Sequence, residues 1–437
     1  MALEVLGWLL LIFGLLVSVA IHELGHLLPA KRFGVRVSEY FVGFGPTLWS
    51  RQRGETEYGI KAIPLGGYVR LVGMIPPADE VKPVSLGGRA GRLIADARDA
   101  SVLEVREGEE SRAFYRLDWW KKVIVMFGGP FTNLVLAALL FTVVLTGFGT
   151  PQQTLTVREL LPCVPAAGTV ECASGDPTSP AILAGLQPGD TIVSADGVAL
   201  AAWTDLTSYV AERPGEPVTL IVDRDGEQLT LVLTPAARER AVVDEAGEPV
   251  LNSAGEPVTE RVGFMGIYST TELERQPVFS GVALTGQYLR AMAPVLVNLP
   301  VEVWEVGKAA LGITERDPSG LMGLVGVGRT AGEITSADVA GYGVQEKVAD
   351  MLMLLGGLNL ALFAFNMIPL VPLDGGHIAS AVWQAIKNGW ARLRGMPTAR
   401  PVDVARMMPL AYGVFGILIV MTVVLLYADI FAPVRLA

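Results

Sequence analysis

Four long runs of apolar residues set the limits on what this chain can fold into. A helix needs about 20 residues to cross the roughly 30 Å of hydrocarbon in a bilayer, and each run is about that long. Hydrophobic residues make up 51% of the sequence and charged residues only 18%, a balance typical of membrane proteins. We therefore expect a polytopic α-helical membrane protein with about four transmembrane helices. The runs are 5–21, continuing through a polar motif to 30, then 123–150, 351–373 and 407–428.

Lysine and arginine residues beside these runs predict the orientation of the chain, because cytoplasmic flanks carry an excess of them. By this rule, the segments after the first run, before the second run and between the third and fourth runs lie in the cytoplasm. Both termini and residues 151–277 then lie outside. That outer stretch contains 19 acidic residues and 7 arginines, a net charge of −12, against −10 for the whole chain. The remainder is only slightly basic and lacks the footprint of a nucleic-acid-binding protein. The basic flanks are Lys31, Arg32 and Arg36, then Lys121 and Lys122, then Lys387, Arg392, Arg394, Arg400 and Arg406.

The first run carries His22, Glu23 and His26 in an otherwise apolar segment. Positions four apart share one face of a helix, so both imidazoles can point at one metal ion while Glu23 reaches a water there. On a soluble helix, two surface or core histidines would be the simpler interpretation. An ionisable side chain at membrane depth costs about 2.5–3.5 kcal/mol or more, so these residues need a partner. The environment therefore favours a metal site of the zinc hydrolase type.

A third metal ligand has to come from elsewhere, because 27–32 offers none. The end of the third run supplies two candidates, Asp374 and His377. The run ends on the same predicted side of the membrane as His26, so either residue can meet the motif. Carboxylate and imidazole are both common zinc ligands, and chemistry alone does not choose between them.

Between the runs, the sequence predicts further structure. Glycine-punctuated β-type segments in 31–74 predict a hairpin or small sheet close to the membrane. Short β-type runs around one helical stretch predict a compact module at 154–235. From Phe279, apolar residues at helical spacing predict a helix lying in the outer interface. The charged insertion that follows residue 74 has an irregular pattern, and no chemistry can be assigned to it.

Both cysteines, Cys163 and Cys172, fall in the predicted outer stretch. A compartment outside the cytoplasm would let a loop-closing disulfide persist. Two reduced, partly buried thiols are the alternative, and the sequence leaves this choice open.

Several motifs together resemble a known family. The loop 179–190 and the strand that follows it resemble a PDZ domain in the circularly arranged form of bacterial proteases, which implies a groove for a peptide strand or C-terminus. His-Glu-x-x-His in a first transmembrane helix, Asn-x-x-Pro-x-x-Pro-Leu-Asp-Gly-Gly from Asn366, and the PDZ-like module between them resemble the site-2 protease family of intramembrane zinc metalloproteases, in its bacterial form with one PDZ domain.

The resemblance implies roles for individual residues. His22, His26 and Asp374 correspond to the ligands of one Zn²⁺ per chain, and Glu23 to the general base. His377 then has no ligand role. Other motifs resemble the family's substrate-clamping β-hairpin, its second-span motif, which runs from Gly128 to Asn133, and its substrate-contacting asparagine. The substrate-binding residues implied in this way are Gly43, Phe44, Gly45, Gly66, Gly67, Tyr68, Asn133 and Asn366.

The implied reaction is hydrolysis of the transmembrane segment of a single-span protein in regulated intramembrane proteolysis, for example an anti-sigma factor already cut outside. The implied partners are this substrate, a peptide or C-terminus at the PDZ groove, and membrane lipid. The implied location is the inner (plasma) membrane, with the active site towards the cytoplasm. A non-catalytic PDZ scaffold with a structural metal site is one rival function, although the intact Glu23 argues against it. A peptidase for signal-peptide remnants is another.

The expected divisions of the chain are 1–30 for the first transmembrane helix with the histidine motif, 31–74 for the membrane-associated β-hairpin, 75–120 for the cytoplasmic insertion, 121–150 for the second transmembrane helix, 151–277 for the extracytoplasmic PDZ domain with a charged excursion, 278–345 for interfacial helices and a loop, 346–376 for the third transmembrane helix with the Asp ligand, 377–406 for a cytoplasmic loop, and 407–431 for the fourth transmembrane helix.

Overall fold

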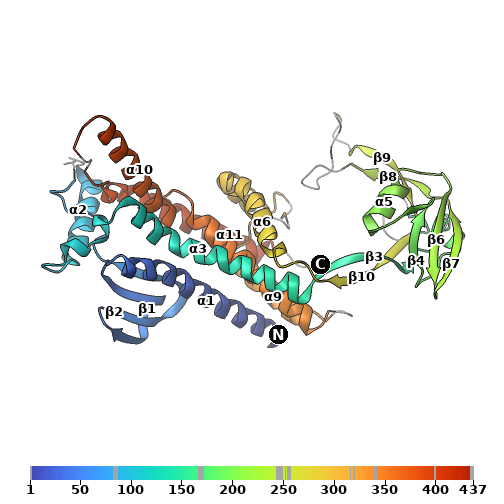
Figure 1. Ribbon diagram of the computed structural model, residues 1–437, viewed down its shortest axis with the longest axis horizontal. Coiled ribbons are helices and arrows are strands. Elements are labelled where there is room, and N and C mark those ends of the chain that lie inside the picture. Colours follow the sequence, from blue (N-terminus) through green and yellow to red (C-terminus); the bar gives the residue numbers. More distant parts are fainter. Residues whose placement is uncertain are drawn as a thin grey trace. The chain divides into compact units, whose positions relative to one another are not determined.

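The computed structural model describes residues 2–81, 87–165, 172–242, 250, 252, 257–314, 316–317, 320–338, 342–397 and 400–433. The chain divides into two compact units (Figure 1). One consists of Met1–Phe148 and Pro277–Ala437, and the other of Gly149–Gln276.

Four helices of the first unit are long and apolar enough to cross a membrane, and each of the four predicted runs falls mainly within one of them. Helices α1, α3 and α9 lie side by side (Figure 1). Their contacts are mainly apolar, and Asn359 adds a polar one by donating to Ser18 Oγ at 2.9 Å. The four helices are α1 (Ala2–Arg32), α3 (Trp119–Val143, continued by the π-helical turn Val144–Phe148), α9 (Val344–Asn366) and α11 (Met408–Phe431, preceded by the 3₁₀ turn Val404–Met407).

The third of these helices ends earlier than the sequence predicted. Helix α9 stops at Asn366, and a separate helix, α10 (Asp374–Leu393), begins at the expected ligand Asp374. The predicted boundaries 346–376 and 377–406 are therefore wrong at this junction. Pro369 and Pro372 explain the break, because proline lacks the N–H that a continuing helix requires.

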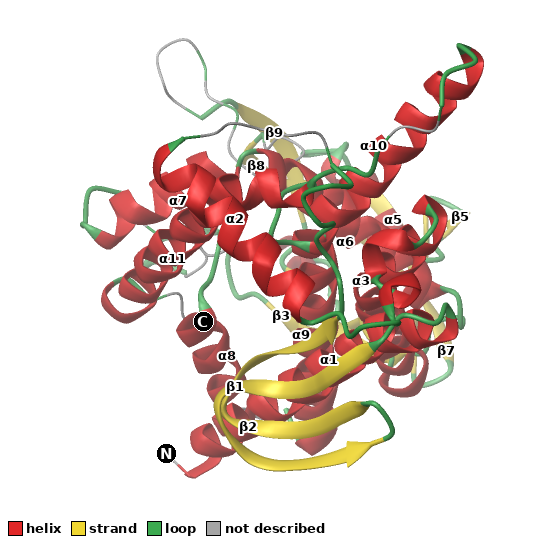
Figure 2. Ribbon diagram, turned by 90° about the vertical axis from the view of Figure 1, so that its left-hand side faces the viewer, coloured by secondary structure: helices red, strands yellow, loops and turns green. Residues whose placement is uncertain are grey.

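Strands β1 (Val37–Arg53) and β2 (Thr56–Leu71) pair antiparallel beside α1 (Figure 2). Both strands are long and bent, so the start of β1 lies between the two ends of β2. Glu39, for example, pairs with Arg70 on one side and with Glu57 on the other. The result is a curled sheet in which Gly67–Leu71 pairs with a strand on one side only, among the described residues.

The remaining helices of this unit are α2 (Gly88–Leu103), α6 (Ser280–Val297), α7 (Leu299–Ala310) and α8 (Leu324–Ser336). Helix α2 lies in the insertion whose pattern had suggested irregular structure. An ion pair of 2.8 Å between Arg98 and Asp403 ties it to the segment before α11. Helix α6 begins within one residue of the predicted interfacial helix.

The second unit is a β-sheet with two helices. Antiparallel strands follow the order β10-β3-β4-β6-β7, with β5 beside β4, and α5 packs Leu206 and Val210 into the core. The elements lie close to the short strands and helix expected at 154–235. They are β3 (Thr150–Leu160), α4 (Pro180–Leu183), β4 (Thr191–Ala195), β5 (Val198–Ala199), α5 (Trp203–Ala211), β6 (Val218–Arg224), β7 (Glu227–Leu233) and β10 (Ile267–Glu274).

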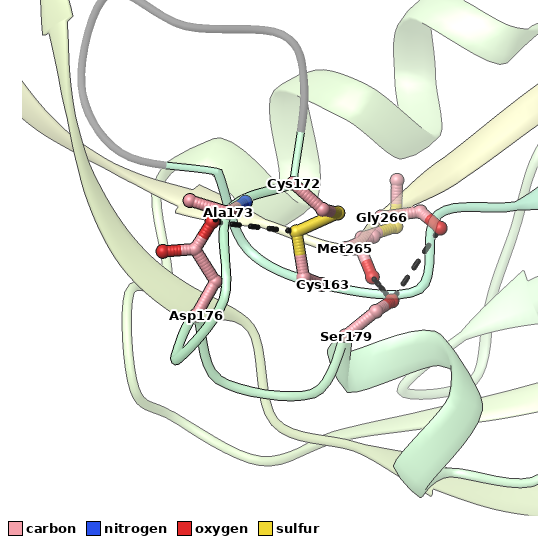
Figure 3. The surroundings of a disulfide bond; sticks show 7 residues. All are labelled: Cys163, Cys172, Ala173, Asp176, Ser179, Met265 and Gly266. Carbon is pink, nitrogen blue, oxygen red and sulfur yellow. Dashed lines mark hydrogen bonds between the residues drawn. A yellow bond between two sulfur atoms is a disulfide. The ribbon is translucent and has the colours of Figure 1, made fainter.

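Two further features belong to this unit. Strands β8 (Ala236–Ala241) and β9 (Thr259–Phe264) pair with each other, and most of the charged excursion between them lies outside the described residues. Cys163 and Cys172 form a disulfide (Figure 3), and Asp176 accepts a hydrogen bond from the Ala173 N–H beside it at 2.8 Å. Of the two states that the sequence left open, the structure has the bonded one.

Candidate metal centre

Three side chains from two helices converge in the first unit. Nε2 of His22 and Nε2 of His26 lie 3.2 Å apart, and each lies 3.4 Å from Oδ2 of Asp374. Among the described residues, these three form the one group of potential ligands close enough to hold a metal ion. Helical spacing brings the histidines together on α1, and the start of α10 brings Asp374 to them.

The dimensions of this triangle fit tetrahedral zinc. Zinc–nitrogen and zinc–oxygen bonds of about 2.0–2.2 Å, at tetrahedral angles, separate ligand atoms by about 3.3–3.5 Å. Oδ2 of Asp374 is buried and has no hydrogen-bond partner. A buried carboxylate oxygen without a donor is costly unless a cation satisfies it. The donor set, two imidazoles and one carboxylate, is that of catalytic zinc sites, which leave a fourth position for water.

Contacts from α3 determine how the imidazoles face the site. Nδ1 of His26 lies 2.8 Å from the carbonyl oxygen of Val125. A carbonyl only accepts, so Nδ1 carries the proton and Nε2 keeps its lone pair for a metal. Nδ1 of His22 lies 3.1 Å from the side-chain amide of Asn133, which is 1% exposed.

Gly129 of α3 provides the space for both rings. A Cβ at this position would meet Nε2 and Cε1 of His26 and would lie 2.8 Å from Nε2 of His22. Any larger residue would therefore occupy the volume that the two ligand nitrogens fill. The space that the two imidazole rings need therefore explains why position 129 is a glycine.

Glu23 lies beside the curled sheet. A Cβ added to Gly67 would approach Cγ of Glu23 to 3.2 Å. Tyr40 donates its hydroxyl to the carbonyl of Ala20 at 2.7 Å. Burial, together with the nearby Glu23 carboxylate, raises the pKa of Tyr40 to about 12, so this residue remains a neutral donor.

The hairpin residues implied as substrate contacts form a cluster. Gly43, Gly45 and Gly66 have positive φ, between 81° and 93°, so the bent strands themselves require glycine there. The ring of Tyr68 stacks with that of Phe44 at 6.3 Å. Its hydroxyl donates to Glu39 at 2.7 Å, and burial and this hydrogen bond raise the pKa of Tyr68 to about 12.

The two asparagines implied as substrate contacts, and the alternative ligand His377, lie in different places. Asn366 is the last residue of α9, and its amide donates to the Leu362 carbonyl in the same helix at 3.0 Å. Asn133 contacts His22, a candidate metal ligand. His377 lines a small cavity of about 30 Å³ with Lys122 and Gln384, one turn beyond Asp374. The geometry thus favours Asp374 over His377 as the third ligand.

Sequence reasoning missed three residues of this centre. Gly129 was seen only as part of a motif, while Tyr40 and the Val125 carbonyl gave no signal at all. Each acts through a contact between segments distant in sequence, and only the fold reveals such contacts.

Two imidazoles, a carboxylate and an adjacent glutamate are the residues expected of a zinc metallopeptidase centre. Comparison with known proteins agrees. The model of peptidase family M50 matches residues 10–410. Zinc metalloprotease Rip1 of Mycobacterium tuberculosis is 32% identical over 99% of both chains. Metalloprotease MmpA of Caulobacter vibrioides is 30% identical over 86% of both. Zinc metalloprotease RasP of Oceanobacillus iheyensis is 26% identical over 87% of this chain and 90% of its own.

The chain therefore belongs to peptidase family M50, the site-2 protease family. It is a zinc metalloprotease of regulated intramembrane proteolysis.

Proposed function

We propose that this protease hydrolyses the transmembrane segments of single-span membrane proteins, such as an anti-sigma factor already cut outside the membrane. The observation that carries the proposal is the His22, His26 and Asp374 triangle, which joins one apolar helix to the segment following another and has Glu23 beside it. One Zn²⁺ per chain is held by these three side chains.

The reaction needs a base as well as a metal. Bound zinc supplies Lewis acidity, which makes water a stronger acid and polarises a peptide carbonyl. Glu23 takes the proton from the attacking water and returns it to the leaving amine. Asn133 and the Val125 carbonyl keep His22 and His26 oriented during this step.

A helical substrate has to unwind before its backbone can be cut. The stretch Gly67–Leu71 pairs with β1 on one side, and its Gly67 lies beside Cγ of Glu23. Adding an extended substrate strand alongside it would present a peptide bond to the base. The residues Gly43, Phe44, Gly45, Gly66 and Tyr68 shape the bend and the aromatic surface of the same sheet.

The orientation and the second unit complete the proposal. The basic flanks support an inner-membrane protein with both termini and the 149–276 unit outside and the metal centre towards the cytoplasm. The strand and helix arrangement of that unit supports a PDZ domain, with a groove for a peptide or a C-terminus. Asn366, at the end of α9, contacts substrate.

The decisive test uses purified full-length protein and a model transmembrane segment. Wild type should contain about one zinc per chain and cleave the segment. Glu23→Gln should keep the zinc and lose cleavage by several orders of magnitude. If Glu23→Gln cleaved normally, the assignment of the base would be wrong.

The ligand assignment has its own test. Asp374→Ala should lose bound zinc and His377→Ala should keep it; the reverse result would exchange their roles. Substrates trapped in cells on Glu23→Gln would identify the physiological target. Trapping of signal-peptide remnants alone would favour the rival peptidase function.

A further inference from the structure

Helix α10 differs from the four apolar helices. It carries an apolar face with spacings of three and four residues, and that face is open: Trp383 is 57%, Ile386 56%, Trp390 55% and Leu393 84% exposed. Basic residues lie between and beyond these positions. In Figure 2 its C-terminal end extends away from the other helices. Such a helix is typical of the boundary between lipid headgroups and acyl chains.

A groove of about 980 Å³ runs between α10 and the segment that leads to α11. Its walls are mainly apolar and include Trp383, Trp390 and Met407. A volume of this size is at the upper end for a ligand site in a protein.

Three cations line the same groove: Lys387, Arg400 and Arg406. Nζ of Lys387 donates to the backbone carbonyl of Arg400 at 3.2 Å, and the Arg400 guanidinium donates to the carbonyl of Val81 at 2.9 Å. Among the described lining residues, Asp403 is the one carboxylate. It already accepts from Arg98 at 2.8 Å and from Arg406 at 3.0 Å. The groove therefore combines an apolar wall with an excess of positive charge.

We propose that this groove binds an anionic phospholipid. Its phosphate lies near Lys387 and Arg400, and an acyl chain lies along Trp383, Trp390 and Met407. Tryptophan at the headgroup level and clustered basic residues are the chemistry that recognises such lipids. A free phosphate ion would leave the apolar wall uncovered, and a zwitterionic lipid would not use the excess of cations.

Native mass spectrometry of the delipidated full-length chain tests the proposal. Dioleoylphosphatidylglycerol should bind as one tight equivalent, at concentrations where dioleoylphosphatidylcholine does not. Lys387→Gln with Arg400→Gln should weaken this binding about tenfold or more, since each cation contributes near an anionic headgroup. The charge-matched control, Arg89→Gln with Arg392→Gln, alters two exposed cations outside the groove and should bind as wild type. Zinc content should be unchanged in all variants, which shows that they fold.

A second measurement locates the acyl chain. Phosphatidylglycerol with brominated chains should quench part of the tryptophan fluorescence, and Trp383→Phe with Trp390→Phe should remove that part. Equal phosphatidylglycerol binding by the Lys387→Gln, Arg400→Gln variant and by its control, the Arg89→Gln, Arg392→Gln variant, would overturn the proposal. So would equal affinity for phosphatidylcholine, displacement of the lipid by millimolar inorganic phosphate, or no tight equivalent in wild type.

Discussion

The side-chain amide nitrogen of Asn133 lies 3.1 Å from Nδ1 of His22, and Oδ1 of the same amide is buried without a partner. A metal at Nε2 requires a proton on Nδ1, which then has to donate. A half-turn of the amide brings Oδ1 to Nδ1 and satisfies both atoms. Asn133 is therefore a positioning residue for His22.

Replacing Asn133 separates this role from the substrate contact that the sequence had suggested. Asn133→Ala should lower zinc affinity about 10- to 100-fold, because the imidazole loses its acceptor. Asn133→Asp keeps an acceptor and should bind zinc within a few-fold of wild type. Competition with a chelator measures both values. Unchanged zinc affinity with a raised KM in Asn133→Ala would restore the substrate role.

Gly129→Ala should weaken zinc binding without unfolding the helices. The added methyl group meets the ligand nitrogens of His22 and His26, and overpacking of this kind costs about 1–3 kcal/mol. A 10- to 100-fold loss of zinc affinity follows. Gly147→Ala is the matched control, because a Cβ there meets nothing within 4 Å. Equal zinc affinity in the two variants would show that the rings can move aside.

Local sequence patterns predicted the transmembrane helices and the histidine motif. They did not predict features that depend on contacts between segments distant in the sequence. The apolar runs and the spacing of His22 and His26 are local, so the helices and the motif were predictable. The end of α9 was missed because 367–373 is apolar although its prolines prevent a helix. The choice of Asp374 over His377 needed the position of α10 relative to α1, which hydropathy does not encode.

The Cys163–Cys172 disulfide should be detectable in the mass of the intact protein and in the stability of the 149–276 unit. Intact protein without reductant should weigh about 2 Da less than the fully reduced chain. Cys163→Ser should destabilise the 149–276 unit by about 2–3 kcal/mol, because the bond closes a short loop in the unfolded chain. Urea unfolding followed by hydrogen exchange in β3 and β4 measures the loss. Two free thiols in protein from intact cells would contradict both this bond and an outside location.

Asp190 should give the second unit an acid-sensitive element. It is 1% exposed and accepts from Arg224 at 2.6 and 2.8 Å and from the Gln187 N–H at 2.8 Å. The Arg224 guanidinium holds the pKa of Asp190 below its usual value near 3.8. The folded state therefore favours the carboxylate, and this stabilisation is present above about pH 4 and lost as the pH falls through the lowered pKa.

Asp190→Asn should lower the free energy of unfolding by about 1.5–3 kcal/mol at pH 7, and the difference in this free energy between variant and wild type should shrink towards pH 2. Opening free energies from hydrogen exchange in β4 and β6 measure this difference. Arg240→Gln breaks the exposed pair with Glu260 and should change stability by less than about 1 kcal/mol at any pH. A pH-independent deficit in Asp190→Asn would mean that packing, rather than the ion pair, accounts for the loss.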